Sequence, residues 1–461
     1  MRDLLLYTTV GKSTDYLRCL TYFCESLVYT NRTSLHLLII CDTSFHSRVL
    51  EIVSQYAFLH YYVHDAPDSL TPVQASMHKV HVFDFPKIHH FHTALYVDLD
   101  CLFLNSLSTI LQKPIEDNKI YVFSEYDLVE KNNLTWFSLT NETNQSISYY
   151  TQEQMNFLKE KHKLPFNAGL FMFRITPLME RHFKNLTNMI QNFRGGYFYE
   201  QSFMNTYFHL NNMSDNSIFT RTNICMVNST PLDQLTSDHV IVHFNQNAGN
   251  GKEKYEHMHT FWSAYKASHP IGQGIFDTRV DMIQNIVPHD VTIVEIGVFK
   301  GEFAETLLKR NPLQLYLVDI WEKGPVHSGD QDGNNVQVYD GQGLVDIVRK
   351  RFALCPNITI CHSRSDDFLS AIPDNSIDVI YIDGDHSYEG CKSDLENALP
   401  KMRKGGIIMG HDYEMNMVKA TRMWEFGVKR AVDEFCETHS LKLYAKGLDG
   451  CVSYAIIVPF E

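Results

Sequence analysis

Two acidic side chains separated by a single residue, Asp98 and Asp100, follow directly after the apolar run 93–97. Carboxylate oxygens are the ligands that hard divalent cations prefer, and paired acids in an apolar context are costly unless something binds them. A cation bound there can neutralise a diphosphate and so turn it into a leaving group. The spacing therefore predicts a metal site that assists transfer of a group from a diphosphate donor.

A denser group of acidic and histidine side chains lies in the second half of the chain. Asp383, Asp385 and His386 follow one apolar run, and His411 and Asp412 end the next. Parallel strands bring their carboxyl ends to one sheet edge, where doubly wound folds bind ligands. A cation at that edge can lower the pKa of a substrate hydroxyl while a nearby base takes its proton. His386 is the predicted general base, with Asp385 as the second candidate.

A glycine-containing turn precedes this second group. Glu295, Gly297 and Gly301 follow an apolar run and lead into a helical pattern over 303–310. Glycines let the backbone turn tightly and approach a ligand closely. Asp319 ends the next apolar run, about 20 residues on, where an acid suits a ribose diol. The Gly-x-Gly-x-x-Gly spacing of NAD sites is absent, which favours S-adenosylmethionine as the ligand.

The elements that position these residues follow one rhythm in both halves: short apolar runs, polar or glycine-containing loops, then helical patterns. This rhythm predicts α/β architecture twice. The predicted strands are 4–8, 35–41, 93–97, 120–123, 169–174 and 240–244, then 292–296, 315–318, 358–361, 379–382, 406–409 and 452–457. A Pro- and Gly-containing stretch places a linker at 266–280, between domains 1–265 and 281–461. The Gly-, Asp- and Asn-rich stretch 324–343 is predicted to be a long loop.

Composition excludes several classes of protein. Of 461 residues, 44% are hydrophobic and 20% charged, so the chain can form sizeable cores. The balance of 54 acidic and 40 basic residues, net −14, argues against a nucleic-acid partner. The longest apolar runs are strand-sized, far short of the ~20 residues of a membrane span. The start lacks a signal-peptide pattern and no Cys-x-x-Cys pair occurs, which predicts a reducing, cytoplasmic location.

Further blocks in the first half carry a resemblance to a known family. Asn167 opens an apolar run, Glu200 and Gln201 open a helical pattern, and His243 ends an apolar run shortly before Lys252. In this order after the Asp-x-Asp pair, the blocks resemble glycosyltransferase family 8, whose members are retaining enzymes of the GT-A fold. The resemblance implies a nucleotide-sugar donor, above all a UDP-sugar, and Mn²⁺ as the cofactor.

That resemblance also implies a role for each matching residue. The implied metal ligands, which hold the donor diphosphate through the ion, are Asp98, Asp100 and His243. The implied direct donor contacts are Thr8 and Tyr16 at the uridine, Lys252 at the diphosphate, and Asn167, Glu200 and Gln201 at the sugar. Glu200 stands where the family more often has Asp. Front-face attack, usually ascribed to the family, leaves Gln201 as a catalytic candidate only in the sense of a sugar contact or ion-pair stabiliser.

The second half resembles class I S-adenosylmethionine-dependent methyltransferases of the family 24 type, on the glycine turn and the two acid–histidine groups. The implied donor contacts are Glu295, Gly297 and Gly301 at the methionine end, Asp319 at the ribose, and Ser365 and Asp366 at the adenine. The implied ligands of a Mg²⁺ or Mn²⁺ ion are Asp383, His411 and Asp412. The predicted fold class is thus α/β with two Rossmann-like domains, a GT-A glycosyltransferase fold followed by a class I methyltransferase fold.

The leading hypothesis is a bifunctional enzyme that transfers a sugar to a glycan or sugar acceptor and O-methylates a sugar hydroxyl. Fusion would hold the second site at high effective concentration around the first product. Such fusions resemble a pattern of large algal and amoebal viruses, which would place a viral protein in the host cytoplasm. Two alternatives stay open: a methyltransferase whose first domain only binds glycans or nucleotide sugars, and an enzyme that decorates a small natural product. The oligomeric state is not predicted.

Overall fold

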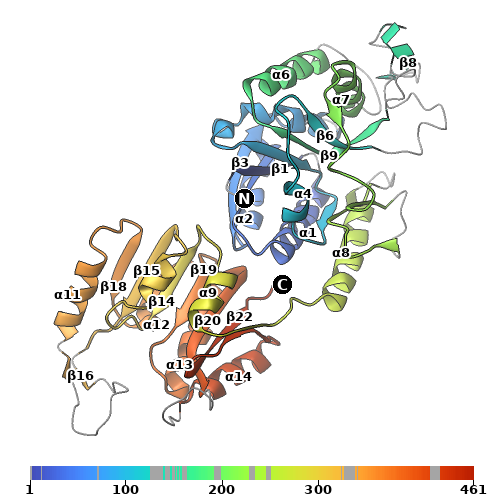
Figure 1. Cartoon of the computed structure of the whole chain (residues 1–461). Coiled ribbons are helices and arrows are strands. Elements are labelled where there is room, and N and C mark those ends of the chain that lie inside the picture. Colours follow the sequence, from blue (N-terminus) through green and yellow to red (C-terminus); the bar gives the residue numbers. More distant parts are fainter. Residues whose placement is uncertain are drawn as a thin grey trace. The chain divides into compact units, whose positions relative to one another are not determined.

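The structure is a computed structural model of the chain, shown in Figure 1. It describes residues 3–11, 13–69, 72–124, 139–140, 146–147, 151, 153–154, 156–157, 164–191, 199–227, 234–245, 251–322, 324–325, 338–339, 341–415 and 426–460. Two compact units make up the chain. Unit 1 takes Met1–Asn31, Leu35–Val53 and Leu59–His269, and unit 2 takes Arg32–Ser34, Ser54–Phe58 and Pro270–Glu461.

Unit 1 is built on a seven-stranded sheet with the order β10-β6-β9-β4-β1-β2-β3. Its strands are β1 (Leu4–Val10), β2 (Leu35–Asp42), β3 (Leu59–Ala66), β4 (Thr93–Val97), β6 (Ile120–Ser124), β9 (Phe166–Arg174) and β10 (Ser214–Asp215). Strands β4, β1, β2 and β3 run parallel, and β9 runs antiparallel to β4 and β6. Because the chain leaves β1 toward β2 and returns on the other side at β4, the switch point of this sheet lies between β1 and β4.

A second, small sheet in unit 1 consists of β11 (Ile224–Met226), β12 (Ile241–His243) and β5 (Cys101–Phe103). β5 begins directly after the Asp-x-Asp pair, and β12 runs antiparallel to it with His243 opposite Cys101. This register brings an imidazole from late in the unit beside carboxylates from its centre.

The helices of unit 1 frame a core in which both faces of the central strands are buried, as expected for parallel strands covered on each side. They are α1 (Asp15–Thr30), α2 (His46–Val53), α3 (Pro72–Ser76), α4 (Ser108–Leu111), α6 (Pro177–Gln191), α7 (Tyr199–Leu210) and α8 (Gly251–Ser268), with 3-10 turns η1 (Thr43–Phe45), η2 (Met77–Asp84) and η3 (Ile88–His90). Tyr96, Phe171 and Phe183 are among the fully buried rings of this core. Unit 1 also contains an antiparallel strand pair, β7 (Leu139–Thr140) and β8 (Ser146–Ile147).

Unit 2 is built on an eight-stranded sheet with the order β13-β21-β22-β20-β19-β14-β15-β18. Its strands are β13 (Gly274–Phe276), β14 (Thr292–Ile296), β15 (Gln314–Asp319), β18 (Ile358–His362), β19 (Ile377–Ile382), β20 (Met402–Met415), β21 (Leu443–Gly447) and β22 (Cys451–Ile457). The five strands from β18 to β20 run parallel, and β22 runs antiparallel to both neighbours. Figure 1 shows β18, β15, β14 and β19 side by side in that order. The switch point lies between β14 and β19.

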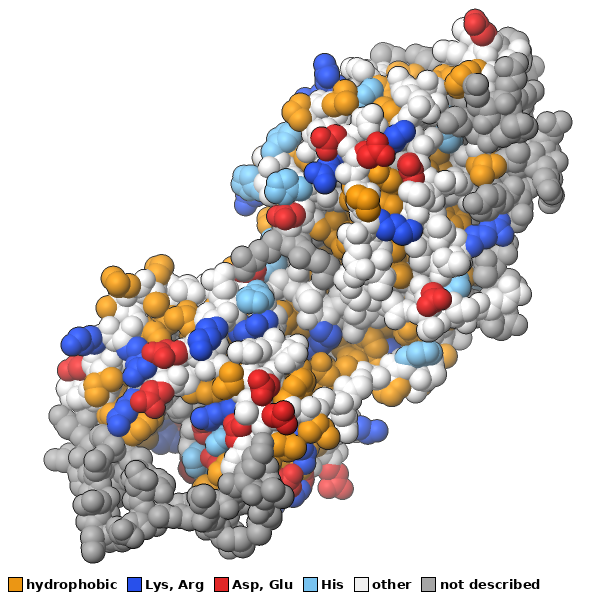
Figure 2. Space-filling model, viewed as in Figure 1, with side chains coloured by type: hydrophobic (Ala, Val, Ile, Leu, Met, Phe, Trp, Pro, Cys, Tyr) orange, Lys and Arg blue, Asp and Glu red, His pale blue; other side chains and the backbone are white. Residues whose placement is uncertain are grey.

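The helices of unit 2 are α9 (Arg279–Ile286), α10 (Ala304–Leu308), α11 (Gly341–Arg351), α12 (Ser365–Ala371), α13 (Tyr388–Ala398) and α14 (Val428–Thr438), with the 3-10 turn η7 (Leu399–Lys401) and the strand pair β16 (Gly324–Pro325) and β17 (Val338–Tyr339). Helices α13 and α14 pack on a core that includes Ile380, Leu395 and Val432. None of the described helices is long and apolar enough to cross a membrane. On the face shown in Figure 2, Lys and Arg side chains lie among Asp and Glu side chains.

The α/β class with two Rossmann-like sheets is confirmed. Eleven of the twelve predicted strands lie within a strand of the structure, and the twelfth, 240–244, contains the shorter β12. The predicted linker 266–280 contains the end of α8, strand β13 and the start of α9, and the division between the two units falls within it, after His269. One prediction needs correction. The predicted loop 324–343 contains paired strands β16 and β17, and α11 begins at Gly341; its other residues lie outside the described ones.

Candidate active sites

The Asp-x-Asp pair lies at the switch point of the unit 1 sheet, immediately after β4. The Asp98 amide donates to Gly169 O at 2.8 Å, and the Phe244 amide donates to Asp100 O at 2.8 Å. These bonds hold the turn between two neighbouring strands. Asp100 is 4% exposed, whereas the Asp98 side chain is 30% exposed. One carboxylate is therefore buried and the other faces an open side.

His243 and a lysine converge on the buried carboxylate. His243 Nε2 lies 3.0 Å from Asp100 Oδ1 and 3.9 Å from Asp98 Oδ2. Lys254 Nζ donates to the other Asp100 oxygen. Burial opposes ionisation of Asp100, but Lys254 and His243 hold its pKa well below the usual range. The group is thus an ionised carboxylate compensated from two sides.

Gly169 makes this convergence possible. A Cβ at this position would lie 2.5 Å from Asp98 Oδ2 and 2.6 Å from His243 Cε1. Any side chain would force the acid and the imidazole apart. The small residue in the predicted Asn-Ala-Gly step into β9 is therefore a requirement of the site.

A second lysine, Lys79, crosses the site from η2. Its ammonium lies 3.3 Å from Asp98 Oδ1 and 3.2 Å from Glu200 Oε1, and it donates to Ala168 O at 3.2 Å. Lys79 is 3% exposed. Burial lowers its pKa, but Asp98 and Glu200 outweigh burial and raise it. Sequence reasoning missed both Lys79 and Lys254, because nothing local marks either lysine as facing a carboxylate.

The residues predicted at the donor sugar surround the same place. Gln201 Oε1 accepts from the Ala168 amide at 3.0 Å, and Asn167 Oδ1 accepts from the Gly169 amide at 2.7 Å. Glu200, 9% exposed, accepts from the Ser76 hydroxyl at 2.7 Å besides its pair with Lys79. The structure thus brings the three predicted sugar-contact residues beside the Asp-x-Asp pair.

Of the residues predicted to contact the uridine and the diphosphate, only some lie near the Asp-x-Asp pair. Tyr16 lies near Asp100, and burial followed by the Asp100 charge raises its pKa. Thr8 has no exposed surface and its hydroxyl has no partner among the described residues, so its side chain does not reach an open site. Its neighbour Thr9 is the threonine that contacts the site, through a 3.1 Å bond to the Tyr96 hydroxyl, which in turn donates to Asp98. The Lys252 side chain lies outside the described ones.

In unit 2, the glycine turn after β14 packs against the end of β19. Gly297 has φ +84°, and a Cβ there would lie 2.0 Å from Asp383 O. Gly301 also has a positive φ, +74°. Only glycine combines this conformation with so close an approach of two chains. The glycine turn and Asp383 therefore lie next to each other at the switch point of the sheet.

Asp319 and Glu295, the two acids near this turn, differ in their hydrogen-bond partners. One Asp319 oxygen accepts from the Val298 and Phe299 amides, each at 2.8 Å, and the other accepts from the Trp321 amide at 2.8 Å. Asp319 thus holds the turn, besides any ribose contact. Glu295 is 1% exposed and its Oε2 has no partner among the described residues. Burial, and then the Asp383 charge, raises its pKa well above the ordinary value.

The predicted acid–histidine cluster is assembled at the ends of β19 and β20. His386 Nε2 lies 3.4 Å from Asp383 Oδ1 and 3.2 Å from Asp412 Oδ2. His411 Nδ1 lies 3.2 Å from the same Asp412 oxygen and 3.8 Å from Asp383 Oδ1. Asp412 has φ +56° and sits where the β20–β22 register shifts between Gly410 and Glu414. This irregularity turns consecutive residues toward one edge.

The two candidate bases differ in their surroundings. The polar contact with Asp383 raises the pKa of His386, while burial opposes it. Asp385 is exposed and accepts from the Ser387 amide at 2.9 Å, just before α13. Asp385 therefore serves the start of a helix in this structure, and His386 is the candidate that faces the acid cluster.

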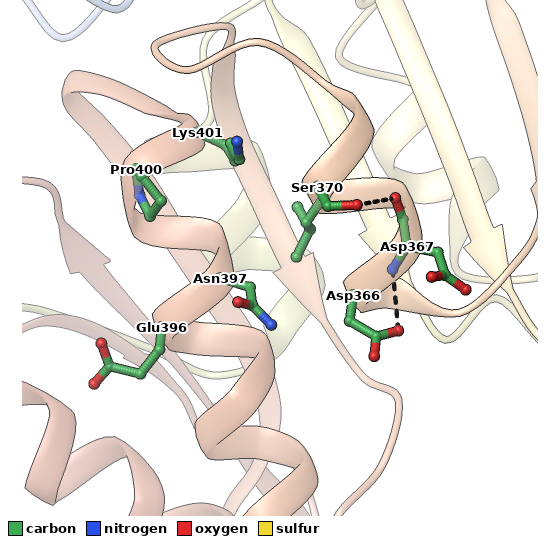
Figure 3. Close-up of a pocket in the computed structure, with 8 residues that line it drawn as sticks. Asp366, Asp367, Ser370, Glu396, Asn397, Pro400 and Lys401 are labelled. Carbon is green, nitrogen blue, oxygen red and sulfur yellow. Dashed lines mark hydrogen bonds between the residues drawn. The ribbon is translucent and has the colours of Figure 1, made fainter.

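Ser365 and Asp366 begin α12 and point to different places. The Ser365 hydroxyl donates to Asp394 Oδ1 at 2.5 Å, inside the unit. Asp366 pairs with Arg364 at 3.1 Å and lines a cavity of about 480 Å³ between α12 and α13. Figure 3 shows Asp366, Asp367 and Ser370 on one side of this cavity and Glu396, Asn397 and Lys401 on the other. Ser365 is not among the residues that line it.

Asp394, the hydrogen-bond partner of Ser365, leads to a prediction about the stability of unit 2. Burial raises the pKa of Asp394 from 3.8 to about 6. The folded chain therefore binds more protons than the unfolded chain across that interval, and stability falls as pH rises through it. We expect Asp394→Asn to stabilise unit 2 by up to about 3 kcal/mol above pH ~7 and to change little near pH ~4. Thermal denaturation across this pH range measures the difference. Asp346→Asn, at an exposed acid on α11, is the matched control and should show no such dependence.

Both sites have a donor set suited to a divalent cation. Asp100, Cys101 and His243 offer ligand atoms within 4.8 Å of one another, as do Asp383, His386 and Asp412. Oxygen with imidazole nitrogen suits Mn²⁺ as well as other borderline ions. The Nδ1 atom of buried His243 has no partner among the described residues, so nothing described fixes its tautomer. These groups share Asp100 and His243, and Asp383 and Asp412, with the predicted ligand sets, but they contain Cys101 in place of Asp98 and His386 in place of His411.

Comparison with known proteins finds a family match within unit 2 and a distant relative. Residues 294–413 match the family model described as a methyltransferase domain. The chain is similar to an uncharacterized protein, y4gI, of Sinorhizobium fredii (strain NBRC 101917 / NGR234), with 28% identity over 105 residues. That match covers 22% of this chain and 10% of the relative, so the chain spans about a tenth of that relative's length.

Two solved structures illustrate the similarity in three dimensions. One is the apo form of the glycosyltransferase GlyE of Streptococcus pneumoniae TIGR4, with 13% identity and a TM-score of 0.35 over 88% of this chain and 90% of that one. The other is an S-adenosylmethionine-dependent methyltransferase from Aquifex aeolicus, with 13% identity and a TM-score of 0.29 over 40% of this chain and 90% of that one. The chain is similar to a glycosyltransferase and to a methyltransferase, and residues 294–413 of its second unit match a methyltransferase family model.

Proposed function

We propose that the chain is a bifunctional transferase, which adds a sugar from a nucleotide-sugar donor in unit 1 and O-methylates a sugar hydroxyl in unit 2. The observation that carries this proposal is that each unit has its own acid–histidine group at the switch point of its own sheet. Doubly wound sheets bind ligands at that point. Two such sites in one chain support two reactions rather than one.

For sugar transfer, Asp98, Asp100 and His243 would hold the cation, preferably Mn²⁺ and with a UDP-sugar as donor. When bound, the ion offsets the charge of the leaving diphosphate. Lys79 and Lys254 place two further positive charges at the same carboxylates, so either can contact the diphosphate once it displaces a carboxylate partner. Lys254 is thus a second candidate for the role predicted for Lys252.

The sugar ring would lie against Glu200, Gln201 and Asn167. Glu200 would accept from a sugar hydroxyl, while the three N–H donors of its partner Lys79 already face Asp98, Glu200 and Ala168 O. We assign no nucleophile to the protein, because no described carboxylate in the site stands free of a cationic or hydroxyl partner. Gln201 is then a sugar contact or stabilises an ion pair.

For methyl transfer, S-adenosylmethionine would lie across the glycine turn, with Glu295 at its methionine end and Asp319, Ser365 and Asp366 toward its nucleoside. Asp383, Asp412 and His411 would hold the cation of this site, Mg²⁺ or Mn²⁺, which lowers the pKa of the acceptor hydroxyl when bound. His386 would take the hydroxyl proton at Nε2, the atom that faces both acids. Asp385 is the second candidate for that step.

The donor part of this proposal predicts a large effect at one glycine. We expect Gly297→Ala to weaken S-adenosylhomocysteine binding by at least about tenfold and to cost about 1–3 kcal/mol of stability, because φ is positive and the new Cβ meets Asp383 O. Calorimetric titration and thermal denaturation measure the two effects. Gly272→Ala is the matched control, since a Cβ at Gly272 meets nothing within 4 Å. Unchanged binding by the Gly297 variant would contradict a donor site at this turn.

The experiment that tests both halves is incubation with a panel of UDP-sugars, Mn²⁺, S-adenosylmethionine and a pool of glycan acceptors. Release of UDP reports the first reaction and release of S-adenosylhomocysteine the second. If UDP-sugars bind but release no UDP, unit 1 is a binding module. Mass spectrometry of the products separates glycan from small-molecule acceptors.

A further inference from the structure

Arg279, the first residue of α9, is anchored at the edge of the unit 2 site by its backbone. Its amide donates to Asp449 Oδ2 at 3.1 Å, and a Cβ at Gly447 would lie 2.8 Å from the Arg279 Cα. The turn between β21 and β22 therefore fixes where this residue starts. Neither the glycine turn nor the acid–histidine cluster includes it, and sequence reasoning did not single it out.

The guanidinium group of Arg279 reaches into the switch point. It lies over the Phe303 ring at 4.4 Å from the ring centroid, and its Nη1 is 3.5 Å from Asp383 Oδ2. Phe303 follows the glycine turn and Asp383 follows β19, so the charge lies between these two segments. The side chain is 30% exposed, which leaves one side open to a ligand.

Contacts with the protein do not use the full bonding capacity of this group. A guanidinium has five N–H donors in a planar fork. It bonds the Tyr381 hydroxyl, and its distances to Asp383 and Asp449 are 3.5 Å and 3.8 Å, at or beyond the limit of a hydrogen bond. A planar, bidentate acceptor such as a carboxylate complements the donors that remain.

The charges around Arg279 match one end of the proposed methyl donor. The amino-acid end of S-adenosylmethionine carries an ammonium and a carboxylate. Glu295, buried with one unpartnered oxygen, suits the ammonium, and Arg279 is the cation whose charge acts on Glu295. Glu295 therefore offers an acceptor oxygen to the ammonium, and Arg279 offers N–H donors to the carboxylate.

We propose that Arg279 binds the α-carboxylate of the methyl donor and so selects S-adenosyl amino acids over other adenosyl thioethers. The proposal rests on the proposed methyltransferase function of unit 2. The alternative hypothesis is that Arg279 orients Asp383, the nearest carboxylate, for cation binding.

The test compares two ligands without added cation: S-adenosylhomocysteine, which has the amino-acid end, and 5′-methylthioadenosine, which lacks it. For Arg279→Met we expect S-adenosylhomocysteine to bind about 10- to 100-fold more weakly, because a charged hydrogen bond is lost, while 5′-methylthioadenosine binds as it does to the wild type. Arg279→Lys, which keeps a positive charge, should recover part of the affinity. Arg351→Met removes a surface pair with Glu305 and should change neither ligand.

Each outcome decides a different question. Equal weakening of both ligands, or of neither, by Arg279→Met would overturn the carboxylate contact. Unchanged cation-free binding with a changed cation dependence of methyl transfer would assign Arg279 to Asp383 instead. If the wild type binds neither ligand, the methyltransferase proposal itself fails. Retained 5′-methylthioadenosine binding shows that the variant is folded, and Arg279→Lys carries the comparison if the Met variant is insoluble.

Discussion

We expect Asp100→Asn to lower sugar transfer by roughly a thousandfold or more, with methyl transfer unchanged. The amide removes a hard cation ligand and leaves Lys254 and His243 facing a neutral group, so about 4 kcal/mol of charge stabilisation is lost in the step that releases the diphosphate. UDP release from a UDP-sugar with Mn²⁺ measures the first activity, and S-adenosylhomocysteine release measures the second.

Asp100 is buried, so the variant also needs a check on folding. Removing one partner of a buried pair costs about 3–5 kcal/mol. Asp98→Asn changes the more exposed acid of the same pair and should lower sugar transfer with a smaller loss of stability. Asp117→Asn, at an exposed acid that pairs with Arg174, is the matched control. Sugar transfer that survives in both the Asp98 and the Asp100 variants would refute the site.

The second large effect is expected at Asp383. Asp383→Asn should lower methyl transfer by roughly a thousandfold, because Asp383 faces His386 and His411 in the proposed cation site. The affinity for S-adenosylhomocysteine should change by no more than about threefold. Single-turnover methyl transfer and calorimetric titration measure the two quantities. Loss of donor binding as large as the loss of transfer would place Asp383 in the donor site instead.

The general base is separable from the cation ligands in the same assay. His386→Gln should remove the rising limb of the pH dependence of methyl transfer, since the polar contact with Asp383 raises the pKa of that imidazole. Asp385→Asn is the matched comparison, because Asp385 is exposed and bonds the Ser387 amide. A larger effect at Asp385 than at His386 would exchange the two roles.

The strands and their ends could be predicted from the sequence because they depend on local pattern. Parallel strands buried on both faces read as continuous apolar runs, as in β2 and β14. Acids that follow such runs, Asp98 and Asp383, must then lie at a sheet edge. Strand β3 was missed because its mostly half-buried sequence, Leu-His-Tyr-Tyr-Val-His-Asp-Ala, contains no continuous aliphatic run.

The charged partners of the two sites could not be predicted, because packing between distant segments places them. Lys79 meets Asp98 from a 3-10 turn, and Lys254 meets Asp100 from the far end of unit 1. Arg279 reaches Asp383 only because the β21–β22 turn holds its backbone. No local sequence pattern indicates these ion pairs. Gly169 and Gly297 can be identified in the sequence, but the close contacts that require glycine there are seen only in the structure.

One measurement tests most directly that this chain has two independent transfer sites. Wild type, Asp100→Asn and Asp383→Asn are assayed side by side with Mn²⁺, the panel of UDP-sugars, S-adenosylmethionine and the acceptor pool, and UDP and S-adenosylhomocysteine are quantified together. We predict that the wild type releases both products and that each variant loses only its own. Methyl transfer by the wild type without UDP release from any donor, with Asp100→Asn indistinguishable from it, would contradict the account.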